Sequence, residues 1–173
     1  MTLKQLWDSK GYEYYPTDKF SHHRYQDIYE ELFCKWKNEP INILEVGCYK
    51  NGSLKLFEDY FAQAHIVGLD NAEYEGAVKL NRAEVFIEDF YSNNRQLSNL
   101  TIAIDDGPHD INSQLVFIEK VWPTIVSGGI LIVEDVWPGF KPHIDSLNIS
   151  YTIIEFCPPT DEDNDRILLF RKP

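Results

Sequence analysis

The sequence lacks the features that mark secreted, zinc-binding and membrane-spanning proteins. Its 3 cysteines, Cys34, Cys48 and Cys157, are odd in number and include no C-x-x-C pair, so neither a disulfide framework nor a zinc site is predicted. No apolar run approaches the length of a membrane span, and no apolar signal-peptide core follows Met1. These absences predict a cytoplasmic protein that makes no contact with a membrane.

Positive charge is also scarce. Lys and Arg number 16 against 28 Asp and Glu, which gives a formal net charge of −12 and a pI near 4.7. A nucleic-acid partner is therefore not expected, because phosphate backbones are bound by basic faces. The hydrophobic content of 43% is that of an ordinary globular protein, and 173 residues can form one domain with a substantial core. Small molecules are the expected partners.

Short apolar runs alternate with helical patterns from residue 41 onward. The runs have the length and composition of buried strands and lie at residues 41–46, 65–70, 84–87, 100–105 and 129–134. Helices are predicted between them at residues 53–61, 73–81, 92–97 and 113–126. Strands that alternate with helices indicate a parallel, doubly wound sheet.

The end of the chain breaks this alternation. Residues 151–156 and 167–171 are predicted to be strands joined by the turn-rich residues 158–165, with no helix between them, which is the pattern of an antiparallel hairpin. The predicted fold class is therefore α/β, with a doubly wound, mostly parallel seven-stranded sheet that ends in an antiparallel hairpin. Residues 41–173 are expected to form this Rossmann-like domain.

Residues 1–40 are predicted to be a helical N-terminal segment of the same compact unit. Its second helix should cover about residues 25–36. The polar connector at residues 17–23 is either a solvated loop or a functional lid. Its histidines, His22 and His23, are expected to be solvated.

Acidic residues and a histidine lie where the fourth and fifth predicted strands end. Asp105, Asp106 and His109 follow the fourth strand, and Glu134 and Asp135 follow the fifth. Ligands of open α/β sheets bind at the carboxyl ends of strands. Carboxylates suit Mg²⁺, and imidazole suits proton abstraction. An ordinary acidic strand end is the alternative for the last pair, but carboxylates that cluster without a cation repel one another.

A glycine turn and a second set of acids follow the first three strands. Gly47 and Gly52 flank the turn between the first strand and its helix, as in the opening of a nucleotide-binding βαβ unit. The second strand ends in Asp70, at roughly the twenty-residue spacing of a ribose-binding carboxylate. Glu88 and Asp89 end the third strand. The turn and its acids predict a nucleotide-type site.

Several motifs resemble, in order, those of the macrocin and mycinamicin sugar O-methyltransferases. The first block is Leu44-Glu45-Val46-Gly47-Cys48-Tyr49-Lys50-Asn51-Gly52-Ser53-Leu54, followed by Ile66-Val67-Gly68-Leu69-Asp70, and cephalosporin-hydroxylase-like proteins carry a similar block. Asp106-Gly107-Pro108-His109 matches the D-G-x-H element, and Gly128-Gly129 through Glu134-Asp135 matches the G-G…E-D element. Thr17-Asp18-Lys19 resembles an upstream segment of the family. The resemblance implies the class I fold of methyltransferases that use S-adenosyl-L-methionine (SAM).

The resemblance also implies a role for each site residue. Those assigned to SAM are Glu45, Gly47, Gly52, Ser53, Asp70, Glu88, Asp89 and Asp105. Glu45 and the two glycines would border the methionine part, Asp70 the ribose, and Glu88 or Asp89 the adenine. Because side chains alternate between the two faces of a strand, Asp105 should point away from the site and support it through hydrogen bonds. Those assigned to Mg²⁺ are Asp106, Glu134 and Asp135, and His109 is assigned as the general base.

The implied function is a Mg²⁺-dependent O-methyltransferase that acts on a vicinal-diol small molecule, a sugar or glycosylated metabolite. A cation that chelates two acceptor oxygens would orient them and stabilise the alkoxide. One alternative is a catechol-type O-methyltransferase, which usually has Asp-Asn where this chain has Glu134-Asp135. The other is a non-catalytic SAM-binding protein, regulatory or part of a complex. A homo-oligomer in which a neighbouring copy completes the acceptor pocket is also an expectation.

Overall fold

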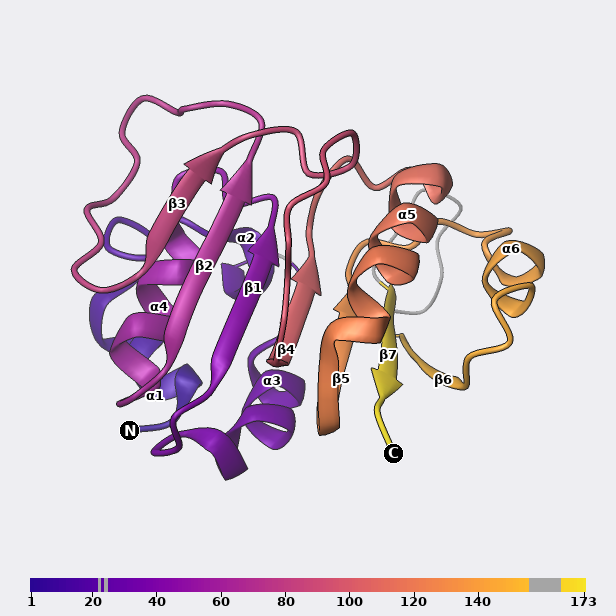
Figure 1. Ribbon diagram of the computed structural model, residues 1–173. Coiled ribbons are helices and arrows are strands. Elements are labelled where there is room, and N and C mark those ends of the chain that lie inside the picture. The colour runs from indigo at the N-terminus through magenta and orange to yellow at the C-terminus, as the bar shows by residue number, and fades with distance from the viewer. Residues whose placement is uncertain (22, 24, 156–165) are drawn as a thin grey trace.

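The computed structural model describes residues 1–21, 23, 25–155 and 166–173, shown as a ribbon in Figure 1. The N-terminal elements are the helices α1 (Leu3–Lys10), α2 (Asp18–Ser21) and α3 (Gln26–Phe33) and the 3-10 helix η1 (Cys34–Trp36). The elements that follow are β1 (Asn42–Val46), α4 (Gly52–Tyr60), β2 (His65–Asp70), β3 (Glu84–Ile87), β4 (Leu100–Asp105), α5 (Ile111–Val121), η2 (Trp122–Thr124), β5 (Ile125–Val133), α6 (Lys141–Asp145), β6 (Tyr151–Glu155) and β7 (Arg166–Arg171). Among the described helices, none is long and apolar enough to cross a membrane.

The strands form one sheet in the order β3-β2-β1-β4-β5-β7-β6. Strands β1 to β5 pair in parallel, whereas β7 runs antiparallel to both β5 and β6. The predicted mostly parallel seven-stranded sheet with a C-terminal antiparallel hairpin is confirmed. Residues 156–165, which hold the predicted turn and Cys157, lie outside the described residues.

Alternating side chains build a hydrophobic core on each face of the sheet. In β5, Ile130 and Ile132 pack into the core that includes α1, α3 and α4. Leu131 and Val133 of the same strand pack into the core that includes α5 and α6. Figure 1 shows these helices on the two faces of the sheet. Because the central strands are covered on both faces, their sequences are continuous apolar runs.

Residues 1–40 share the first of these cores with α4. Leu3 of α1 and Tyr29 and Phe33 of α3 are buried together with Phe57 of α4. The ring centroids of Tyr29 and Phe33 are 4.7 Å apart, and those of Phe33 and Phe57 are 5.9 Å apart. The N-terminal segment is therefore a packed layer over α4, and its packing determines where the connector at residues 17–23 lies.

The helix predicted for residues 73–81 is wrong. Glu58 on α4 instead accepts hydrogen bonds from the backbone N–H groups of Asn81, Arg82 and Ala83. These bonds fix the C-terminal end of the segment, at residues 81–83, against α4.

The helix predicted for residues 92–97 is also wrong. The ammonium of Lys120 on α5 donates to the carbonyls of Phe90, Tyr91 and Asn93, with N–O distances of 3.0, 2.8 and 2.7 Å. The lysine thus bonds carbonyls to which helical N–H groups would otherwise donate.

Candidate functional site

The turn after β1 lies against the end of β4 with no room for a side chain. Gly47 has a φ of +86°, and a Cβ atom there would lie 1.8 Å from the carbonyl oxygen of Asp106. The backbone N–H of Asp106 donates to the carbonyl of Val46 at 2.8 Å. Both the backbone angle and the close approach require glycine. The glycine turn and the acids after β4 are therefore adjacent.

The acids that end β2 and β3 are fixed by hydrogen bonds. One carboxylate oxygen of Asp70 accepts from the backbone N–H groups of Cys48 and Tyr49 at 2.7 and 2.8 Å. Asp70 therefore holds the glycine turn in place from the neighbouring strand. Glu88 forms an ion pair with Arg95, with Nε–Oε1 and Nη2–Oε2 distances of 2.6 and 3.1 Å.

A cavity of about 380 Å³ opens at the carboxyl ends of β1 to β4. Its size is within the range of about 300–1,000 Å³ for small-molecule sites. The predicted site residues that line it are Gly47, Ser53, Asp70, Glu88, Asp89, Asp106 and His109. Its lining among the described residues does not include Glu45, Gly52, Asp105, Glu134 or Asp135. It does include Thr17 and Asp18 of the predicted connector, together with Tyr12 and Pro16, which the sequence pattern did not single out.

Gly52 and Asp105 lie behind the wall of this cavity. A Cβ atom on Gly52 would lie 2.3 Å from the carbonyl carbon of Pro16, so the N-terminal segment packs directly on the turn. The Asp105 carboxylate accepts a hydrogen bond from the hydroxyl of Tyr91, whose side chain lines the cavity. Burial raises the pKa of Asp105 to about 7, although the bond from Tyr91 opposes this shift. The Asp105 carboxylate therefore lies behind the cavity wall and holds the side chain of Tyr91, which is part of that wall.

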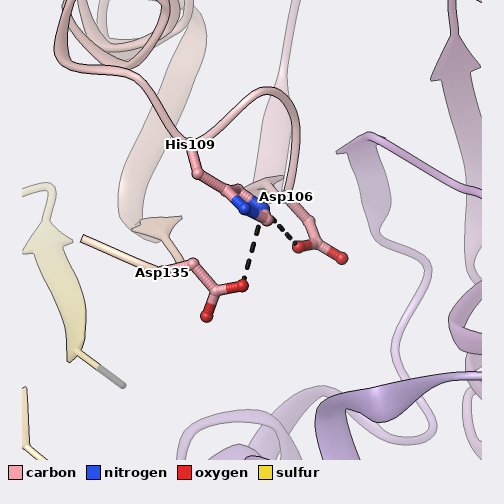
Figure 2. A group of neighbouring side chains, drawn as sticks. All are labelled: Asp106, His109 and Asp135. Atoms are coloured by element: carbon pink, nitrogen blue, oxygen red, sulfur yellow. Dashed lines mark hydrogen bonds and ion pairs between the residues drawn. The ribbon is translucent and has the colours of Figure 1, made fainter. Parts of the chain in front are cut away.

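Asp106, His109 and Asp135 converge beyond the ends of β4 and β5 (Figure 2). The His109 Nε2 atom is 3.2 Å from Asp106 Oδ1 and 3.5 Å from Asp135 Oδ2. His109 and Asp135 have positive φ values of 59° and 52°. Residues other than glycine rarely adopt this conformation, and those that do are concentrated at functional sites. Burial lowers the pKa of His109, but the two carboxylates outweigh burial and raise it above its usual value.

Glu134 and Asp135 point to different partners although they are neighbours in the chain. The Glu134 carboxylate accepts a hydrogen bond from the hydroxyl of Tyr29. Asp135 accepts one from the hydroxyl of Tyr25 at 2.8 Å and turns its other oxygen toward His109. Burial raises the pKa of Glu134 to about 7, against the opposing charge of Lys19.

The ammonium of Lys19 lies among three of the carboxylates at the strand ends. Its ammonium is 2.5 Å from Asp106 Oδ2 and 3.5 Å from Glu45 Oε1, and it also contacts Glu134 Oε2. Burial lowers the pKa of Lys19, but the three carboxylates raise it well above its usual value. The amine is therefore charged.

In the described part of the connector, residues 17–21 and 23, the solvated-loop alternative is wrong, and so is the expectation that His23 is solvated. Lys19, Phe20 and His23 are buried, and Asp18–Ser21 forms the short helix α2. His22 lies outside the described residues. The signal that could have identified Lys19 is the set of acids at the strand ends, because buried carboxylates require a compensating cation.

The acids also fit a divalent cation. In the described part of the chain, Asp106, His109 and Asp135 offer ligand atoms that all lie within 4.8 Å of one another. Carboxylate oxygens are the ligands that Mg²⁺ prefers. Glu134, which the resemblance assigns to the ion, is not in this group.

Comparisons with curated proteins relate the chain to sugar O-methyltransferases, although no protein-family model matches it. It is 29% identical to mycinamicin VI 2''-O-methyltransferase of Micromonospora griseorubida, over 80% of this chain and 39% of that protein. It is 28% identical to 8-demethyl-8-(2-methoxy-alpha-L-rhamnosyl)-tetracenomycin-C 3'-O-methyltransferase of Streptomyces olivaceus, over 69% of this chain and 34% of that protein. The chain thus spans less than two fifths of the length of these relatives.

Solved structures of MycE, a methyltransferase from the mycinamycin biosynthetic pathway, have the same fold as this chain. The complex with Mg and SAH matches 99% of this chain and 55% of MycE, with a TM-score of 0.73 and 21% identity. The complex that also holds mycinamycin VI matches with a TM-score of 0.76. The chain has the class I methyltransferase fold. The resemblance that the sequence motifs indicated is confirmed.

In this class I methyltransferase fold, the acids and the cavity share one edge of the sheet. The register of β4 against β5 places Asp105 beside Val133, so Asp106 and Glu134 follow adjacent strand ends. The glycine turn reaches the same edge from β1. One cavity therefore borders the glycine turn as well as Asp106 and His109.

Proposed function

We propose that the protein is a SAM-dependent O-methyltransferase that acts on a hydroxyl of a vicinal-diol small molecule, a sugar or glycosylated metabolite. The observation that carries this proposal is the single cavity that reaches from Gly47 and Asp70 to Asp106 and His109. SAM at the glycine turn and an acceptor at the imidazole would share one space. The similarity to sugar O-methyltransferases supports this reaction and this class of acceptor.

The residues around the turn would hold SAM. Gly47 is assigned to its methionine part and Asp70 to its ribose, Ser53 would contact the cofactor beside the turn, and Glu88 or Asp89 would face the adenine. All five line the cavity. The residues that do not line the cavity would hold the lining residues in place; they are Glu45, Gly52 and Asp105.

His109 and the two aspartates would act at the acceptor hydroxyl. SAM would supply a methyl group on a sulfonium, and Asp106 and Asp135 would hold Mg²⁺, which would supply positive charge for the acceptor oxygen. His109 accepts the hydroxyl proton as that oxygen takes the methyl group.

Methyl transfer is tested with labelled SAM and a panel of sugar-bearing acceptors and catechols. Transfer of label to a sugar hydroxyl, with loss of transfer on chelation of the metal, is the expected result. Calorimetry should show SAM binding by the wild-type protein that is lost in Asp70→Asn and kept in Asp145→Asn, a surface control on α6.

The other outcomes separate the alternatives. Transfer to catechols alone would favour a catechol-type enzyme. SAM binding without transfer to any acceptor would favour a non-catalytic binding protein. Failure of the wild-type protein to bind SAM would overturn the proposal.

A further inference from the structure

A second hollow, of about 570 Å³, opens between the N-terminal end of α5 and the segment that joins β5 to α6. We call it the α5–α6 groove. Pro108 and His109 line both this groove and the cavity at the glycine turn, and among the described residues the two hollows share no other lining residue. A molecule whose hydroxyl meets the His109 imidazole can therefore extend into the groove without entering the space assigned to SAM.

Apolar side chains form much of the wall of the α5–α6 groove. Ile111, Trp137, Pro138 and Phe140 line it in addition to Pro108. Phe140 is buried, whereas the side chain of Trp137 is 48% exposed. An indole left half exposed in a concave surface can bury that area against the face of a flat apolar ring. The groove therefore has the wall of a small-molecule site, with Trp137 as its open stacking surface.

Charged groups contribute little to this wall. Apart from the imidazoles of His109 and His143, no side chain that can carry positive charge lines the groove in the described part of the chain. Its carboxylate, Asp110, caps α5: Oδ1 accepts from the backbone N–H groups of Asn112 and Ser113 at 3.0 and 3.1 Å, and Oδ2 accepts from the Ser113 hydroxyl at 2.7 Å. A diphosphate would meet this carboxylate and neither lysine nor arginine, so an uncharged occupant fits better.

We propose that the α5–α6 groove holds the aglycone of a glycoside acceptor, an uncharged apolar ring that stacks on Trp137 while a hydroxyl of the attached sugar meets His109. This inference rests on the proposed function, which places the acceptor hydroxyl at the imidazole. It makes Trp137 a specificity-determining residue. Glycosides with an apolar ring are favoured over free sugars, which do not reach the indole, and over nucleotide sugars, which carry charge where the ring would lie.

Binding without turnover tests the groove. The probes are naphthyl and methyl glycosides of glucose, galactose and rhamnose, titrated in the presence of SAH and Mg²⁺ and followed by ligand-observed NMR. At least one naphthyl glycoside should bind about tenfold or more tightly than its methyl counterpart, because only the naphthyl ring can stack on the indole. A uridine diphosphate sugar should bind no more tightly than the methyl glycoside of the same sugar.

Variants of Trp137 locate this advantage of the naphthyl ring. Trp137→Ala should remove it and leave the affinity for the methyl glycoside unchanged, whereas Trp137→Phe should keep part of it. Ile153→Ala is the matched control, since Ile153 is an exposed apolar side chain on β6 that lines neither hollow at His109. It should keep the whole advantage. Nuclear Overhauser contacts between the naphthyl and Trp137 indole protons in the wild type decide the matter if Trp137→Ala does not fold.

Three results would overturn the proposal: no binding of any naphthyl glycoside, equal affinity for naphthyl and methyl glycosides, or an advantage that survives in Trp137→Ala. The two proposals can also fail independently. Transfer of label from SAM to a sugar without any advantage of the naphthyl ring would leave the methyltransferase proposal standing and reject the role of the groove. Binding of the naphthyl ring at Trp137 without transfer of label would support the groove and count against the reaction.

Discussion

At the scale of single residues, the charges around His109 determine the pH at which it can accept a proton. Asp106 and Asp135 outweigh burial and raise its pKa above 6.5. In metal-free protein, NMR titration of the imidazole should therefore show a midpoint above 6.5. Asp135→Asn should lower this midpoint by removing a carboxylate 3.5 Å from the ring, whereas Asp145→Asn, which removes a carboxylate paired with Lys141 on α6, should leave it unchanged.

In the metal-free protein, the raised pKa of His109 keeps the imidazole protonated to higher pH. A midpoint at or below 6.5, or one that does not move in Asp135→Asn, would contradict the role of the two carboxylates.

Gly47 allows the close approach between the turn after β1 and the end of β4. Gly47→Ala should destabilise the protein by about 3 kcal/mol or more, because its Cβ atom would meet the backbone of Asp106. Gly128→Ala is a matched control: Gly128 also has positive φ, at +77°, but nothing lies within 4 Å of its added Cβ atom. It should cost about 1 kcal/mol from backbone strain alone. Urea unfolding measures both, and equal losses would show that the close approach carries no cost.

At the scale of elements, α2 links the N-terminal segment to the cavity. Thr17 and Asp18 line the cavity, while Lys19 and Phe20 are buried. Addition of SAM should therefore slow amide hydrogen exchange in residues 15–21 by about tenfold or more. Exchange in α6, which contributes no residue to this cavity, should not change. Unchanged exchange in residues 15–21 would mean that bound SAM does not stabilise this segment.

Elements with strong local signals were predictable from the sequence. The predicted bounds of β2, β3 and β4 match those of the structure, because each of these short apolar runs ends at polar residues. The glycine turn was also predictable, since Gly47 meets a steric demand that has a sequence signature.

Features that depend on distant partners were not predictable. Glu58 bonds the backbone at residues 81–83, and Lys120 bonds the backbone at residues 90–93; both lie on other elements and leave no periodicity in the segments that were predicted to be helical. Lys19 was missed for the same reason. A lysine in a polar connector has no local feature that marks it as the buried partner of acids that lie 87 and 115 residues away.

At the scale of the whole molecule, buried acids and net charge act in the same direction on stability. Burial raises the pKa values of Glu45, Asp105 and Glu134 to about 7, from ordinary values of 4.5 and 3.8. The folded protein therefore binds more protons than the unfolded chain between these values and pH 7, so stability is lost as pH rises through this window. The net charge of −12 adds self-repulsion as the remaining groups ionise.

The melting temperature of the metal-free protein should accordingly fall by several degrees, roughly 5 °C or more, between pH 5 and pH 8. Asp105→Asn should flatten this decline, because the amide cannot ionise and its oxygen can still accept the hydrogen bond from Tyr91. Asp145→Asn is the matched control: the pKa of Asp145 is lowered, so this carboxylate is ionised throughout the window and its removal should leave the slope unchanged. A slope in Asp105→Asn equal to that of the wild type would assign the loss of stability to the net charge rather than to this buried carboxyl group.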